Sequence, residues 1–164
     1  MLHEGLTITP QAASDQFRVF HPENQRFQAL DVMKDFDTWK YTRWSSREIG
    51  RCKWWFWDAN PELAMFMRNG MEEITVGEAA QRFKQKTEEL LTIDPGFVRK
   101  INSIQQAIAA GVKLPPIIAV KGRNPISVPS IVEGNHRSLA ILLASMESSN
   151  KIDNLVLLGT KKLI

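Results

Sequence analysis

The sequence predicts an α+β fold, in which a small mixed sheet is flanked by helices. Apolar residues recur at helical spacing over 95–110, short apolar runs at 117–120 and 155–158 indicate buried strands, and Gly134 separates a third strand from an Ala- and Leu-rich helix. The 164 residues, 43% of them hydrophobic and 24% charged, suit one globular domain with a core.

The elements before residue 94 are the least regular. A helix is expected over about 24–34, Asn60-Pro61 begins another, and Asn69-Gly70 marks a turn. Residues 1–71 are interpreted as an N-terminal, aromatic-rich extension that packs on a core formed by 72–164.

Two signals mark the start of that core. Thr75 and Glu78 have the spacing of a capping box, which predicts a helix over about 76–91, with a short strand over 73–75 before it.

The later elements have clearer boundaries. Asp94 as N-cap and Pro95 as first helical residue predict a helix over 95–110, which ends at Gly111 and turns its apolar stripe to the sheet. Strands are then expected at 117–120, at about 127–132 and at 155–158, and a helix from the glycine turn at 134 to about 145.

The segment 131–144 reads IVEGNHRSLAILLA and places Gly134, His136 and Arg137 at a helix start. The first N–H groups of a helix have no intrahelical partner, the macrodipole adds positive charge there, and basic side chains add donors for phosphate oxygens. The pattern indicates a phosphate site. The alternative is that Gly134 only turns the chain and the basic residues form a solvated helix start.

The order helix, LPPIIAV, hairpin, IVEGNHRSLA and helix resembles the ParB/sulfiredoxin superfamily over about 72–160. Its members carry a Pro-Ile strand and then a glycine, variable residue, His or Arg, Arg motif, with which they bind nucleoside triphosphates. The resemblance implies that ATP or another nucleoside triphosphate binds at Gly134, Asn135, His136, Arg137 and Ser138.

Sulfiredoxins also use a lysine and a serine one turn apart in the helix before this strand, and Lys100 and Ser103 stand at the matching positions. Their spacing puts both on one helix face, opposite the apolar stripe. The alternative is a pair of ordinary solvent-facing residues.

Two departures limit the resemblance. Asn135 stands where sulfiredoxins have their reactive cysteine, which excludes sulfiredoxin activity. Partition proteins of the ParB type continue into a helix-turn-helix domain, whereas this sequence stops at Ile164, so we expect it not to be a complete centromere-binding protein.

All five tryptophans lie between Trp39 and Trp57, among basic residues. Rings beside cations suit single-stranded nucleic acid or a protein interface, but we favour core packing, with an exposed remainder that contacts DNA or a protein. Cys52, the single cysteine, is expected to be buried, and it excludes an internal disulfide and a multi-cysteine zinc site.

The leading hypothesis from these motifs is a nucleotide-binding phosphohydrolase, an ATPase with nuclease activity, like plasmid- and phage-borne relatives that interfere with DNA transfer. Such chemistry uses Mg²⁺ and a carboxylate, for which Glu133 is the candidate, while His136 and Arg137 stabilise charge on the phosphoryl group. Glu133 has an alternative role as a helix-start charge. Two other functions stay open: a non-catalytic module whose nucleotide switches a protein- or DNA-binding surface, and a small-molecule kinase.

Charge and hydropathy add weaker constraints. A net charge of +3 permits nucleic acid without requiring it, and the three histidines lack metal-ligand spacing. There is no signal-peptide pattern and no run near ~18 apolar residues, so we expect a cytoplasmic protein with no membrane partner.

Overall fold

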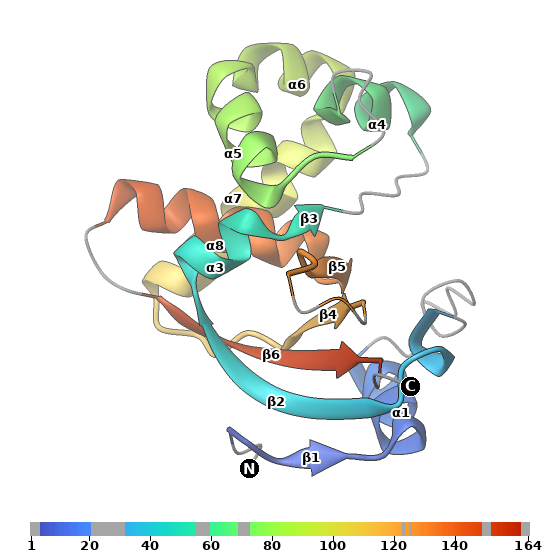
Figure 1. The fold of residues 1–164 in the computed structure, drawn as a ribbon. Helices are drawn as coiled ribbons and strands as arrows, with labels where there is room; N and C mark the ends of the chain where they lie inside the picture. Colours follow the sequence, from blue (N-terminus) through green and yellow to red (C-terminus); the bar gives the residue numbers. More distant parts are fainter. Residues whose placement is uncertain are drawn as a thin grey trace.

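The computed structural model contains both helices and strands (Figure 1). The structure describes residues 4–20, 32–54, 60–68, 73–122, 124, 126–148 and 152–161. The elements are β1 (Thr7–Ile8), α1 (Pro10–Phe20), β2 (Thr38–Ser45), α3 (Ser46–Arg51), β3 (Lys53–Trp54), α4 (Pro61–Arg68), α5 (Val76–Gln85), α6 (Thr87–Ile93), α7 (Pro95–Ala109), β4 (Ile117–Lys121), β5 (Ser130–Glu133), α8 (Asn135–Glu147) and β6 (Asp153–Thr160).

One six-stranded mixed sheet, in the order β1-β2-β6-β4-β5-β3, confirms the predicted α+β class. β6 is antiparallel to β2 and parallel to β4, and β5 is antiparallel to β4 and parallel to β3. β1, β2 and β3 come from residues 1–71, and β4, β5 and β6 come from residues 72–164. Both parts of the chain therefore contribute strands to the same sheet. The N-terminal part supplies strands to it, where the sequence suggested only an extension packed on a finished core.

The two faces of the sheet bury separate clusters, since alternate residues of each strand point to opposite sides. In β4, Ile117 and Ala119 face the helices α5 to α8, whereas Ile118 and Val120 face the cluster under α1. α8 lies against β4, and α7 packs on α8 and α6 (Figure 1). The apolar residues Phe97, Val98 and Ile101 of α7 belong to the same cluster as Ile117 and Ala119 of β4, and direct contact of this stripe with the sheet stays a prediction.

Side-chain caps fix several helix starts as predicted. Thr75 and Glu78 form a capping box at α5, and Asp94 accepts a hydrogen bond of 2.9 Å from the Phe97 N–H at the start of α7. Gly111, with φ +75°, ends α7 as expected. At α4, the Asn60 side chain accepts from the first-turn N–H groups, which confirms the Asn60-Pro61 start.

The predicted helix over 76–91 is in fact two helices that meet at Lys86, whose φ of −125° and ψ of 24° are not helical. Phe83 and Leu90 are seven residues apart and both buried, so the apolar period looks continuous through the break. The predicted strand at 73–75 is only an isolated bridge between Lys53 and Thr75. The expected helix over 24–34 is described only from residue 32, and the turn at 69–70 lies outside the described residues.

Three tryptophans pack in the core, which confirms the favoured interpretation for them: Trp39, Trp44 and Trp54 are 0%, 9% and 2% exposed. Trp55 and Trp57 lie outside the described residues. Cys52 is buried, and this burial raises the pKa of its thiol to about 12, with the charge of Glu48 adding to the effect. Within the described residues no helix is long and apolar enough to cross a membrane.

Gly159 is required by the packing of Trp39. A Cβ on Gly159 would lie 2.6 Å from the indole of the buried Trp39, so we expect Gly159→Ala to lower the free energy of unfolding by about 1–3 kcal/mol through overpacking. Gly122→Ala is the control, because its Cβ would meet Ser127 at an ordinary 3.6 Å. Chemical denaturation measures both variants.

Repeating Gly159→Ala in a Trp39→Phe background separates steric overlap with the indole from other effects of the substitution. Trp39→Phe removes the ring atoms that approach Gly159, so Gly159→Ala should cost less in that background than in the wild type. An equal cost in both backgrounds would show that the indole does not impose the glycine.

Candidate functional site

Gly134 turns the chain between β5 and α8. Its φ of +90° is left-handed, a conformation that glycine adopts without the steric cost of a Cβ. As N-cap of α8 it has no side chain, whereas Ser45, Thr75 and Asp94 cap α3, α5 and α7 with their own oxygens. No side-chain oxygen of the N-cap residue therefore accepts from the first N–H groups of α8, where the helix dipole is positive.

Arg137 folds back over this glycine. A Cβ on Gly134 would lie 2.9 Å from Nη2 and 3.3 Å from Nε of Arg137, so the guanidinium occupies the space that the missing side chain leaves. Nη2 donates to the carbonyl of Pro116 at 3.1 Å, while Nε is buried and has no acceptor within the described part of the chain. Burial lowers the pKa of Arg137, and the charge of Glu133 opposes that shift. Arg137 thus lies beside the helix start and also ties it to the segment before β4.

The neighbouring residues are held by packing. The His136 ring lies 5.4 Å from the Phe97 ring, centroid to centroid, which brings the first turn of α7 beside the glycine turn. The carbonyl of Asn135 accepts from Trp54 Nε1 at 3.2 Å and from the Ser138 hydroxyl at 2.9 Å.

Ser138 is placed differently from the expectation. Its side chain is 0% exposed, and its hydroxyl donates to the carbonyl three residues earlier, a common local bond of serine in a helix. In this conformation the hydroxyl proton is directed into the protein and away from a ligand at the helix start.

Lys100 and Ser103 are exposed on α7. Phe97, which contacts His136, lies about one helical turn before Lys100. The side chains of Lys100 and Ser103 make no hydrogen bond or ion pair with another described residue. Their role in the site remains a prediction.

Glu133 is the last residue of β5 and pairs with Ile118 of β4. It is half-buried and acts electrostatically on Arg137. Among the described residues there is no group of three or more His, Cys, Asp or Glu side chains that could hold a metal ion. A single carboxylate fits Mg²⁺ that arrives on nucleotide phosphates, since this ion is usually held by one or two carboxylates and the substrate.

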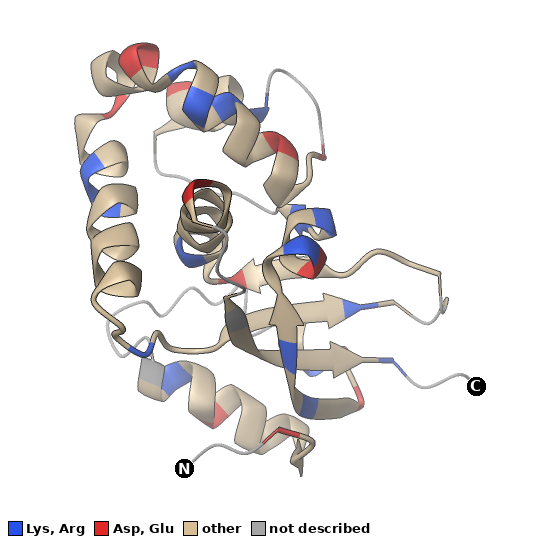
Figure 2. Cartoon of the chain, turned by 90° about the vertical axis from the view of Figure 1, so that its left-hand side faces the viewer, with Lys and Arg blue, Asp and Glu red and all other residues tan. Residues whose placement is uncertain are grey.

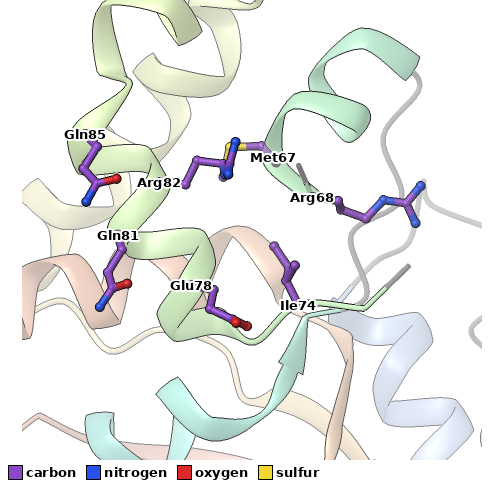
Figure 3. A pocket seen from close by; sticks show the side chains of 7 residues that line it. All are labelled: Met67, Arg68, Ile74, Glu78, Gln81, Arg82 and Gln85. Atoms are coloured by element: carbon purple, nitrogen blue, oxygen red, sulfur yellow. The ribbon is translucent and has the colours of Figure 1, made fainter. Parts of the chain in front are cut away.

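A hollow of about 190 Å³ lies between α4 and α5, and none of the predicted site residues lines it (Figure 3). It is lined by Met67, Arg68, Ile74, Glu78, Gln81, Arg82 and Gln85. The signal in the sequence is the polar face of α5, at positions 78, 81, 82 and 85. Arg82 already donates to the Phe66 carbonyl at 3.2 Å, so one guanidinium of this hollow ties α5 to α4.

Comparisons with known proteins find no match to this chain among family models, curated proteins or solved structures. The resemblance to the ParB/sulfiredoxin superfamily therefore stays a prediction that rests on the motifs.

Substitution of Gly134 tests the packing of Arg137. We expect Gly111→Ala to cost about 1–2 kcal/mol for its left-handed backbone alone, since nothing lies within 4 Å of a Cβ there. Gly134→Ala should cost more, because its Cβ also displaces the guanidinium. Thermal and chemical unfolding measure both.

In an Arg137→Ala background the overlap is absent, so Gly134→Ala should then cost about as much as Gly111→Ala. Equal costs of the two alanines in the wild-type background would contradict the packing of Arg137 on Gly134.

Proposed function

We propose that this protein is a nucleotide-binding phosphohydrolase of the ParB/sulfiredoxin type, and that it binds the phosphates of a nucleoside triphosphate at the start of α8. One observation carries the proposal. The helix end capped only by Gly134 and the guanidinium of Arg137 meet at one point, within 3.4 Å of where a glycine Cβ would be. A helix dipole and a guanidinium together form a strong anion site.

Arg137 is suited to the bound state. Its bond to Pro116 uses one N–H and fixes the orientation of the fork, which reduces the conformational entropy that a phosphate must overcome. Its Nε–H, which lacks an acceptor among the described residues, is a donor that a phosphate oxygen satisfies. Gly134, Asn135 and His136 bring the backbone N–H groups of the helix start.

The remaining predicted residues take supporting roles. Lys100 and Ser103 provide secondary contacts from α7. The hydroxyl of Ser138 holds the first turn through Asn135, which replaces the direct phosphate contact expected from the sequence.

For hydrolysis, Glu133 orients the attacking water, while Arg137 and His136 stabilise the charge that develops on the transferred phosphoryl group. Mg²⁺ carried by the nucleotide would neutralise part of the phosphate charge. The electrostatic effect of Glu133 on the pKa of Arg137 supports this assignment, because a carboxylate that acts on Arg137 would also act on a phosphate bound to that guanidinium.

A second candidate is a non-catalytic nucleotide-binding module. The observation that favours it is that Arg137 and Ser138 both hold the local fold through hydrogen bonds to backbone carbonyls. Measurement of nucleotide hydrolysis distinguishes the phosphohydrolase from the non-catalytic module.

Calorimetry with ATP, CTP, GTP and ADP, in the presence of Mg²⁺, tests binding. Arg137→Ala should weaken the affinity about thirtyfold, corresponding to about 2 kcal/mol for a charge-assisted contact. Arg82→Ala is the matched control, because it also removes a bond from arginine to a backbone carbonyl but lies away from the turn. The absence of binding of all four nucleotides by the wild type would refute the proposal.

Phosphate release tests catalysis. Glu133→Gln keeps the size of the side chain and deletes its charge, so it should suppress turnover at least about tenfold with little change in nucleotide affinity. Glu147→Gln, at the other end of α8, is the control. Wild-type turnover in Glu133→Gln would remove Glu133 from the mechanism, and nucleotide binding without turnover in the wild type would support the module.

A further inference from the structure

Four exposed basic side chains lie on β2 and α3: Lys40, Arg43, Arg47 and Arg51. Alternate residues of a strand point to opposite faces, so Lys40 shares the face of Trp44, on the side where Ile49 of α3 packs, whereas Arg43 points to the other face, with Trp39 and Tyr41. We call Lys40, Arg47 and Arg51 the α3 strip. Figure 2 colours the basic segments of β2 and α3 blue.

Most of this charge is available to a partner. Arg47 and Arg51 are four apart and share a face of α3, and neither makes an ion pair with another described residue. Arg43 has an exposed partner in Glu4 at 3.5 Å, a contact that solvent weakens. The nearby carboxylate of Glu48 accepts the N–H and hydroxyl of Ser45 and so serves the cap of α3.

Within residues 38–54 the exposed side chains are polar, while Leu6, whose carbonyl accepts from the Tyr41 N–H of β2, is 46% exposed. Trp39, Trp44 and Trp54 are buried and present no ring for a base to stack on. None of the exposed large hydrophobic side chains lies in residues 38–54, whereas the centre of a protein interface is usually aromatic and apolar. The described side chains of the α3 strip therefore offer positive charge, including two guanidinium groups that match phosphate oxygens.

We propose that the α3 strip binds the phosphate backbone of double-stranded nucleic acid without sequence preference. Arg47 and Arg51 form the centre of the contact and Lys40 extends it along β2. This binding is independent of the nucleotide proposed at α8, so either proposal can fail without the other.

Fluorescence anisotropy with a short labelled DNA duplex of mixed sequence tests it, in the absence of nucleotide and over a series of salt concentrations. The logarithm of the association constant should fall linearly with the logarithm of salt concentration. The double variant Arg47→Gln, Arg51→Gln should lower the magnitude of that slope by about two and weaken binding about tenfold or more at low salt. Circular dichroism verifies that the variant folds.

Lys84→Gln with Lys113→Gln is the matched control, since it removes two exposed positive charges elsewhere. It should bind within about twofold of the wild type, because phosphate contacts act locally under salt screening. No binding by the wild type at low salt, or equal losses in both double variants, would overturn the proposal.

Two competitors identify the partner class. Tighter binding of single-stranded DNA of the same length would contradict it by indicating exposed aromatic stacking. Displacement of the duplex by polyglutamate at the same charge concentration would assign the strip to acidic proteins instead. Resistance to polyglutamate supports nucleic acid.

Discussion

The position of β6 is the constraint on which the rest of this fold depends. The last strand of the chain lies between β2, from the N-terminal part, and β4, so it joins segments that are far apart in sequence. Its alternate residues complete both cores, with Val156 on the side of α8 and Leu157 on the side of α1. Gly159 in the same strand admits the ring of Trp39. The helices can form from local contacts, but the sheet closes only when long loops have been ordered.

The same sheet order determines the geometry at the start of α8. β5 runs antiparallel to β4 and ends at Glu133, beside Ile118, and the next helix must cross back over the sheet. The chain makes this change through one residue, Gly134, in a left-handed conformation. The absence of a Cβ there has two effects: the helix has no side-chain cap, and the guanidinium of Arg137 packs where the side chain would be. The reversal of the chain at Gly134 thereby brings the positive end of the α8 dipole and the guanidinium of Arg137 together.

What the sequence could predict is what depends on near neighbours. The capping box of Thr75, the Asp94 cap and the glycine turn at 134 each involve residues within about four positions, and all three were identified. The pairing of β2 with β6 could not be predicted from the sequence, because the two strands are more than a hundred residues apart and local periodicity does not indicate which strands pair. For the same reason the residues of the candidate site could be named, but not the bond from Arg137 to Pro116, which joins positions 21 apart.

These long-range bonds matter for any function at the turn, because they are also part of the fold. The indole N–H of the buried Trp54 donates to the carbonyl of Asn135, and Trp54 follows α3 by only three residues. α3 and the first turn of α8 are therefore joined through one ring whose side chain is 2% exposed. Such a ring has almost no freedom to change rotamer in a close-packed core. The two anion-binding surfaces proposed here are therefore linked through Trp54, whose hydrogen bond to the Asn135 carbonyl spans 3.2 Å.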